Sequence, residues 1–203
     1  KLLYAGTSLD TEKAYIGMSE FNTTDNDPMY VGYKYGTTGS LENNRLNTND
    51  STIKTYVDNW YKNNLTAYTK YLSKDAVYCN DRSLGTGQTY SASSSSSFNF
   101  APYYRMDYDT KGAIANPSYN CRDIRDAFSV NNTSAKLDYP VSLMTADEIA
   151  FAGGVAFKTI NTPYAWYYLN SAGGSITGST IWWSLSPFGW SGSYSTVWVV
   201  VAL

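Results

Sequence analysis

This chain of 203 residues contains no histidine. Its absence rules out Ser–His and Cys–His nucleophile pairs and histidine-ligated zinc, and it removes the commonest general base. The two cysteines, Cys79 and Cys121, are too few for a zinc site made from cysteine alone. We therefore expect no metal and no other cofactor, and a binding or structural protein rather than an enzyme.

Charge is also scarce, at 16% of residues, and the formal net charge is −2. A nucleic-acid partner requires a basic face, so we expect none. Lys158 is the last charged residue, and residues 159–203, the neutral tract, carry no charge. Gly, Ser, Pro and Asn interrupt every apolar run well short of the about 20 residues that a membrane helix needs. No membrane span is expected in this chain.

Aromatic residues are plentiful instead, with 20 Tyr and 6 Trp. In the neutral tract they alternate with Ser, Gly and Asn, a composition typical of antibody contact loops, where rigid rings supply contact area and small polar groups adapt around them. Trp182, Trp183 and Trp198 are better explained as core residues. The predicted ligand contacts flank Gly-rich turns and are Tyr164, Trp166, Tyr167, Tyr168, Asn170, Trp190, Ser191, Ser193 and Tyr194.

Two helices are predicted. Residues 51–65 place Ile53, Tyr56, Val57, Trp60 and Tyr61 on one apolar stripe. The opposite face is expected to expose Lys54, Asp58 and Lys62, at spacings that allow pairing. Residues 145–153 begin with a capping box of Thr145 and Glu148 and end at Gly153 and Gly154.

Shorter elements fill the rest of the chain. The sequence predicts a short helix over residues 121–130 with a solvated charged face, and a flexible loop over the serine run 91–97. The acidic turn 25–28 is expected to be an Asx-type turn rather than a calcium site. Strands are predicted over residues 2–5, 14–18, 29–35, 98–106, 139–144 and 197–203.

Two states are open for Cys79 and Cys121. In an oxidising compartment they would pair, and closing a loop of roughly 40 residues would stabilise the fold by about 4 kcal/mol. The other state is two separate buried thiols. The aromatic, weakly charged composition favours a secreted or surface protein, and hence the disulfide.

Residues 139–154 (YPVSLMTADEIAFAGG) resemble the second-helix signature of the formylglycine-generating-enzyme (sulfatase-modifying-factor) superfamily. Residues 182–187 (WWSLSP) look like the Trp-x-x-Ser-Pro segment of related surface domains from gut Firmicutes and their phages, which often follow a pilin-like or secreted leader. Residues 50–64 and 77–83 are also similar to that group. The resemblance implies an α+β, C-type-lectin-like fold: two helices flank small, mostly antiparallel sheets, and a long loop region is displayed.

The chain departs from these relatives in ways that bear on chemistry. Both cysteines precede the helix signature, so the catalytic cysteine pair of the family has no counterpart. The Glu-Pro-Asn and Trp-Asn-Asp calcium motifs of sugar-binding lectins are absent too. The closing Gly-Val-Arg-Pro segment of the group is also missing, so we expect residues 1–203 to be a single domain truncated at both ends.

Three function classes remain. The leading one is a non-enzymatic cell-surface or virion-surface module, an adhesin or receptor-binding domain for an extracellular glycan or protein receptor. In related proteins a diversity-generating retroelement varies such a face. The alternative is a pilin-like or filament subunit that self-associates through its apolar C-terminal strand. A glycan- or cell-wall-acting enzyme would need a carboxylate pair drawn from Asp107, Asp109, Asp147 and Glu148.

Overall fold

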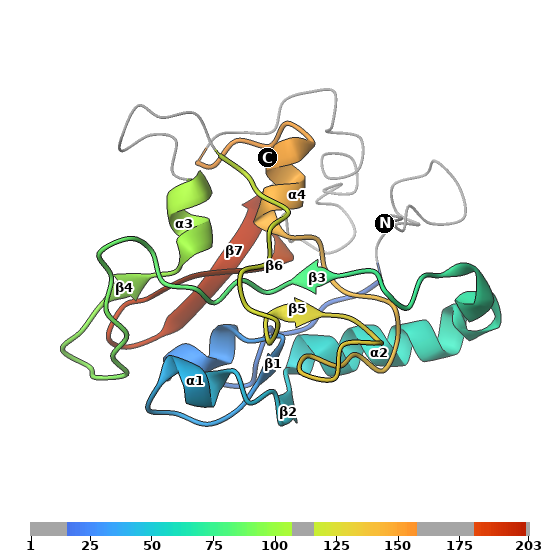
Figure 1. Cartoon of the computed structure of the whole chain (residues 1–203), viewed down its shortest axis with the longest axis horizontal. Helices are drawn as coiled ribbons and strands as arrows, with labels where there is room; N and C mark the ends of the chain where they lie inside the picture. Colours follow the sequence, from blue (N-terminus) through green and yellow to red (C-terminus); the bar gives the residue numbers. More distant parts are fainter. Residues whose placement is uncertain (1–15, 107–115, 158–180, 202–203) are drawn as a thin grey trace.

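The structure, a computed structural model, describes residues 16–106, 116–157 and 181–201 (Figure 1). The described α-helices are α1 (Leu41–Asn44), α2 (Thr52–Asn64), α3 (Ala101–Met106) and α4 (Ala146–Phe151), and two 3₁₀ helices are η2 (Pro28–Val31) and η3 (Thr66–Tyr71). The strands are β1 (Lys34–Tyr35), β2 (Asn49–Asp50), β3 (Tyr78–Cys79), β4 (Phe98–Asn99), β5 (Ala127–Phe128), β6 (Ile181–Trp190) and β7 (Ser195–Val201).

The strands form small antiparallel sheets, as expected for an α+β fold. β1 pairs with β2, β3 pairs with β5, and the third sheet has the order β4-β6-β7. Figure 1 shows α2 along the lower side of the molecule and α3 and α4 on the upper side, with β3 and β5 between α2 and α4 and with β1 and β2 beside the beginning of α2. The strand predicted over residues 197–203 is confirmed as β7, although residues 202–203 lie outside the described part.

The predicted helix over residues 51–65 is confirmed as α2. The Ser51 hydroxyl caps it by accepting the Lys54 N–H at 3.1 Å, and Ile53, Val57 and Tyr61 are buried. The expected exposed face is wrong for Lys54 and Asp58, because both are buried. Their i,i+4 ion pair, at 2.5 Å, is part of the interior.

The predicted capping box is confirmed at α4. The Thr145 hydroxyl accepts the Glu148 N–H at 3.0 Å, and the Glu148 carboxylate accepts the Thr145 N–H at 2.9 Å. The chain leaves the helix through Gly153, whose φ of 98° lies in the left-handed region that glycine tolerates. The local sequence alone was enough to define this helix.

Two buried clusters form the core, and β6 contributes to both. Leu185 of β6 packs in the larger cluster with Phe21, Tyr33, Ile53, Val57, Phe128, Ala135 and Leu137. Trp190, at the end of the same strand, packs in the smaller cluster with Val31, Phe98 and Phe100. The neutral tract therefore supplies core as well as surface.

Several predicted elements differ in the structure. Only residues 98–99 of the expected 98–106 strand are extended, because Pro102 lies in the first turn of α3, where the missing N–H costs nothing. The expected helix over 121–130 is a turn followed by β5, and buried Asp126 is not on a solvated face. Residues 16–18 and 139–144 form no strand, and 29–35 are mostly η2 followed by β1; residues 2–5 and 14–15 lie outside the described part.

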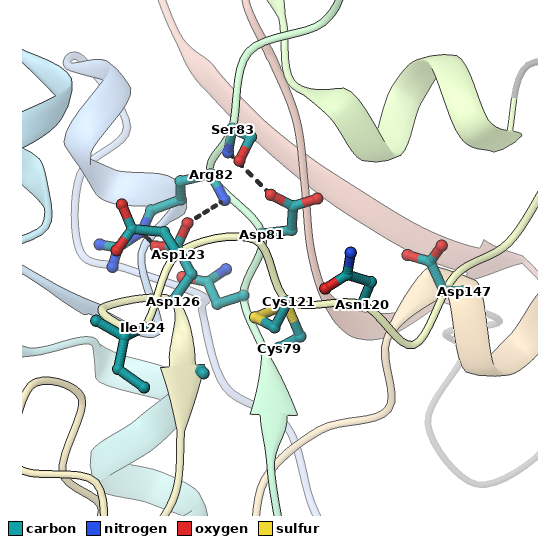
Figure 2. The surroundings of a disulfide bond; sticks show 12 residues. Cys79, Asp81, Arg82, Ser83, Asn120, Cys121, Asp123, Ile124, Asp126 and Asp147 are labelled. Carbon is teal, nitrogen blue, oxygen red and sulfur yellow. Dashed lines mark hydrogen bonds and ion pairs between the residues drawn. A yellow bond between two sulfur atoms is a disulfide. The ribbon is translucent and has the colours of Figure 1, made fainter.

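The Cys79–Cys121 disulfide is present (Figure 2). It joins β3 to the turn before β5, and β3 and β5 pair through Tyr78 with Phe128 and Cys79 with Ala127. A covalent link and a two-residue ladder therefore hold the same two segments. This pairing explains why residues 127–128 are a strand here although their sequence pattern favours a helix.

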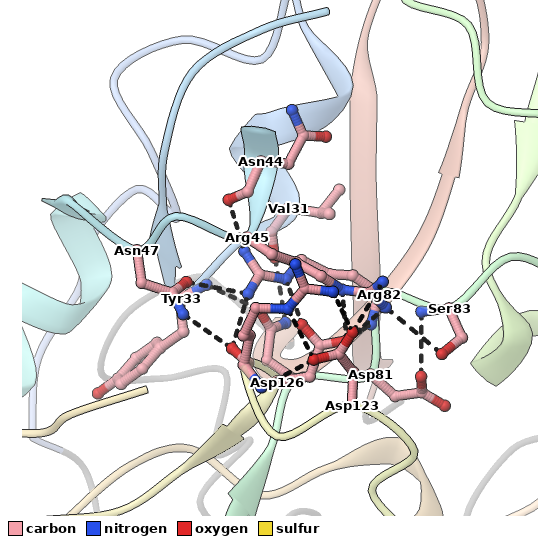
Figure 3. A network of polar contacts seen from close by, with 12 residues as sticks. Val31, Tyr33, Asn44, Arg45, Asn47, Asp81, Arg82, Ser83, Asp123 and Asp126 are labelled. Atoms are coloured by element: carbon pink, nitrogen blue, oxygen red, sulfur yellow. Dashed lines mark hydrogen bonds and ion pairs between the residues drawn. The ribbon is translucent and has the colours of Figure 1, made fainter. Parts of the chain in front are cut away.

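A buried ion-pair network lies beside the disulfide (Figures 2 and 3). Arg82 is 0% exposed, and its Nε donates to Asp126 Oδ1 at 2.7 Å. Its other four N–H groups donate to the carbonyls of Lys34, Asn44 and Arg125 and to the Asn47 amide oxygen, so all five donors are satisfied. Arg45 donates to Asp126 Oδ2 at 2.7 Å. The network ties α1 and β1 to the β3–β5 unit.

Candidate functional site

The structure places the predicted ligand contacts unevenly. Tyr164, Trp166, Tyr167, Tyr168 and Asn170 lie outside the described residues. The other four, Trp190, Ser191, Ser193 and Tyr194, lie at the end of β6 and in the turn that leads to β7.

Trp190 does not belong to an exposed face. Its side chain is 4% exposed, packs against Phe98 and Phe100, and donates its indole N–H to the Ser93 carbonyl at 3.2 Å. The cause is the pairing of β6 with β4, which sets Trp190 opposite Phe98. The expectation of a ligand contact here is corrected, because the ring is a core residue.

The turn after Trp190 is exposed and built from serine. The Ser191 hydroxyl accepts the N–H groups of Ser193 and Tyr194 at 3.3 and 3.2 Å, so this side chain shapes the turn. A Cβ at Gly192 would come within 2.6 Å of the Ser94 carbonyl oxygen, so the turn rests on the serine loop 91–97. Ser193 is exposed, and Tyr194 is 50% exposed, so both are open to a partner.

The charged side chains of the described residues point mostly to one another. Arg105 donates to both oxygens of Asp147 and to Asp81, between 2.6 and 2.9 Å. Arg125 pairs with Glu42 and Asp123, and hydrogen bonds from Arg125 hold the pKa of Asp123 well below its usual range. These charges stabilise the fold rather than form a charged binding face.

The carboxylates that a hydrolase would need are engaged in the same way. Both oxygens of Asp147 accept hydrogen bonds from Arg105, and one also accepts the Ser118 N–H. Glu148 belongs to the capping box of α4. Asp107 and Asp109 lie outside the described residues. Among the described residues, Asp147 and Glu148 are therefore held by structural bonds.

One acidic cluster has the spacing of a cation site. Carboxylate oxygens of Asp50, Asp58 and Asp138 lie within 4.8 Å of one another. The Lys54 ammonium lies among them, at 3.0, 2.5 and 2.7 Å, and is 0% exposed. The three hydrogen bonds match the three donors of an ammonium group. The lysine therefore takes the position that a metal ion would need.

The expected Asx-type turn is confirmed at residues 25–28. Asp27 Oδ1 accepts the Met29 N–H at 2.8 Å and so caps η2, and Oδ2 accepts the Thr38 hydroxyl. Both oxygens of this carboxylate are used within the fold. The geometry is that of a helix cap.

An open cleft of about 440 Å³ lies where β2 and the first turns of α2 meet residues 19–23. Every lining side chain carries a hydroxyl, an amide or a carboxylate. The lining residues are Ser19, Asn22, Thr23, Tyr35, Asp50, Thr52, Thr55, Tyr56 and Asn59. Sequence reasoning missed this cleft, because its residues come from segments that only tertiary contacts bring together.

Comparison of the chain with protein-family models, with curated proteins and with solved structures finds no match. No helix within residues 16–106, 116–157 and 181–201 is long and apolar enough to cross a bilayer.

Proposed function

We propose that this chain is a non-enzymatic ligand-binding domain of a cell or virion surface, with a C-type-lectin-like arrangement of its helices and sheets. It recognises an extracellular glycan or protein receptor through uncharged aromatic, hydroxyl and amide side chains. One observation carries the proposal: the described arginines of the core network are neutralised internally, whereas the β6–β7 turn exposes Tyr and Ser and the cleft offers Tyr, Ser, Thr and Asn, with one carboxylate, Asp50, that is paired with two lysines. The disulfide supports an oxidising, extracellular location.

Such a surface suits ligands without charge. Tyrosine presents a flat apolar ring with a polar tip, and hydroxyl and amide groups bond to polar groups in any orientation. Tyr194 and Ser193 at the β6–β7 turn offer this combination next to the exposed serines of the 91–97 loop. The five predicted contacts between Tyr164 and Asn170 extend the same chemistry along the chain.

The test is a carbohydrate, cell-wall-fragment and host-protein array probed with the purified domain, beside a Tyr167→Ser, Tyr194→Ser double variant. We expect the domain to bind an uncharged ligand and to leave that ligand uncleaved after long incubation. The double variant should bind the same ligand more weakly. Circular dichroism and thermal melting establish that the variant keeps its fold. Release of cleaved products would overturn the non-enzymatic assignment, and binding restricted to highly charged ligands would overturn the recognition mode.

A filament subunit is the second candidate, and β7 favours it. Its sequence, STVWVVV, contains no charge and no proline, the residues that usually block edge-to-edge pairing. β7 is last in the order β4-β6-β7, and no described strand pairs with it on its outer side; the Ser195 N–H donates to the Asp25 carbonyl. Analytical ultracentrifugation tests this candidate: mass that increases with concentration supports self-association, and a monomer at all concentrations argues against it.

A further inference from the structure

The cleft beside α2 is a separate feature from the β6–β7 turn. Its lining comes from residues 19–23, β1, β2 and the first two turns of α2, and none of the described neutral-tract residues 181–201 takes part. In Figure 1, β1, β2 and the beginning of α2 lie together at the lower edge of the molecule. A volume of about 440 Å³ falls within the range of small-molecule sites, roughly 300–1,000 Å³.

The walls of the cleft are fixed before any ligand arrives. The Asn22 amide donates to the Tyr30 carbonyl at 2.8 Å, and its oxygen accepts the Thr52 N–H at 3.3 Å. Next to it, the Ile53 N–H donates to the Phe21 carbonyl at 3.1 Å. Residues 21–22 are thereby tied to the N-terminus of α2. Because the wall is already ordered, binding requires little further loss of conformational entropy.

Tyr56 is held with similar precision. Its hydroxyl donates to the Ile16 carbonyl at 2.8 Å. A Cβ at Gly17 would lie 1.7 Å from that hydroxyl oxygen, so only glycine lets the tyrosine approach the backbone here. Tyr35 supplies a second ring to the lining and contacts Tyr30 edge-on, with 5.2 Å between ring centroids. The cleft thus has two positioned aromatic rings.

The electrostatics of the cleft favour neither an anion nor a cation. Among the described lining residues, Asp50 is the one with a charge at neutral pH, and its oxygens accept hydrogen bonds from Lys34 at 2.5 Å and from Lys54 at 3.0 Å. Burial raises the pKa of Asp50, but these two lysines more than offset it, so its pKa lies below the usual value and it stays ionised. Each carboxylate oxygen keeps acceptor capacity for a ligand hydroxyl.

The remaining lining groups bind hydroxyls well. Thr55 donates to the Ser51 carbonyl at 3.2 Å, which leaves its oxygen able to accept. Asn59 is exposed on the same face of α2, one turn later, and offers both an amide donor and an amide acceptor. A nucleotide would need a basic group free to meet its phosphates, and none of the described lining residues is basic. A wholly apolar ligand would leave the hydroxyl, amide and carboxylate groups of the lining without partners, whereas the rings of Tyr35 and Tyr56 beside those groups suit a ligand with both polar and apolar parts.

We propose that this cleft binds one neutral sugar unit, with Asp50, Thr55 and Asn59 bonding its hydroxyls and the rings of Tyr35 and Tyr56 covering its apolar C–H face. This inference rests on the proposed function and assigns it a second, calcium-free recognition site away from the β6–β7 turn. A sugar fits because it is uncharged, rich in vicinal hydroxyls and flat on one side.

The experiment is saturation-transfer NMR of the intact chain with a panel of methyl glycosides of glucose, galactose, mannose and N-acetylglucosamine, followed by titration of those that bind. Asn59→Ala and Thr55→Ala are the test variants, because both sites are exposed and alanine is well tolerated in a helix. The matched control is Asn63→Ala, which lies one turn further along α2 and outside the cleft.

We expect at least one glycoside to bind the unaltered chain, with affinity about tenfold weaker in each test variant and unchanged in the control. Tyr194→Ser should leave this binding unchanged. If no glycoside binds, or if Tyr194→Ser abolishes binding while Asn59→Ala does not, the cleft is not a sugar site. The second of these outcomes would leave the proposed function intact and move recognition to the β6–β7 turn. Array binding to protein receptors alone would likewise overturn only the sugar assignment.

Discussion

The disulfide-linked unit around β3 and β5 and the end of the β6–β7 hairpin use opposite chemistry. The first buries two arginines and an aspartate, with every Arg82 donor satisfied, and adds a covalent link. The second exposes serine and tyrosine without any charge. Buried charges demand partners in fixed places and therefore specify how distant segments meet. Exposed neutral polar groups need no fixed partner within the protein, so their hydrogen-bonding capacity is available to a ligand.

Within the disulfide-linked unit, removing Asp126 is the largest expected perturbation. Asp126→Ala leaves Arg82 and Arg45 buried without their shared counter-ion, and we expect a loss of about 3–5 kcal/mol in the free energy of unfolding. Urea denaturation followed by tryptophan fluorescence measures it. Glu20→Gln, at an exposed position, is the control and should change little. A loss below about 1 kcal/mol in Asp126→Ala would show that the network contributes little to stability.

Removing the disulfide comes next. Cys79→Ser with Cys121→Ser opens a link across 42 residues, for which the chain-entropy model gives about 4 kcal/mol. The same shift should appear when the unaltered chain is denatured in reducing agent, and reducing agent should not affect the double variant. Equal stability of oxidised and reduced protein would contradict the role assigned to this bond.

Alkaline pH should lower the stability of the disulfide-linked unit by a smaller amount. Burial, together with the nearby Glu148 carboxylate, raises the pKa of Tyr78 from 10.0 to about 12. The unfolded chain therefore loses this proton first as pH rises, so stability conferred by Tyr78 is present below pH 10 and declines toward pH 12. Tyr78→Phe should flatten part of that decline. It should also cost about 1 kcal/mol at neutral pH, because the hydroxyl donates to the Pro140 carbonyl.

Unfolding curves recorded at intervals between neutral pH and pH 12 check this prediction. Burial also raises the pKa of Tyr90 to about 12, so Tyr90→Phe is the matched comparison and should flatten a further part. Identical pH dependence in the Tyr78→Phe variant and the unaltered chain would contradict the assignment.

The smallest expected effect on stability is at the β6–β7 turn. Tyr194→Ser changes a half-exposed ring, and we expect a stability change within about 0.5 kcal/mol. Thermal melting measures it, with Trp190→Ser as the contrast, since that ring is in the core and its loss should cost about 3–5 kcal/mol. A large loss in Tyr194→Ser would show that the turn is structural and would weaken the contrast between the two regions.

Local patterns predicted some elements well. The apolar stripe of α2 and the capping box of α4 each depend on residues that are close together in the sequence, so the sequence was enough to predict both helices. The disulfide followed from there being just two cysteines in a chain of secreted-like composition. In each case the deciding interaction joins residues close together in the sequence, or, for the disulfide, no other cysteine competes for the pairing.

The errors fall where partners distant in sequence decide the structure. Residues 121–130 have a helical pattern, but Arg82 draws Asp126 into the core and β3 pairs with residues 127–128. Lys54 has the spacing of a surface lysine, yet Asp138 arrives from 84 residues away to help bury it. Trp190 looked like a contact residue because it flanks a turn, but β4 covers it. The cleft joins three separated segments, so no local pattern could reveal it.

The central claim is that buried ion pairs hold this fold together and that the protein recognises an uncharged ligand. Its most direct test is the carbohydrate array probed at low and high salt, roughly 50 and 500 mM, since exposed charge interactions are screened across that range. The account predicts the same uncharged ligands at both salt concentrations, with affinities that differ by less than about twofold. Binding confined to sulfated or acidic glycans and lost at high salt would contradict it.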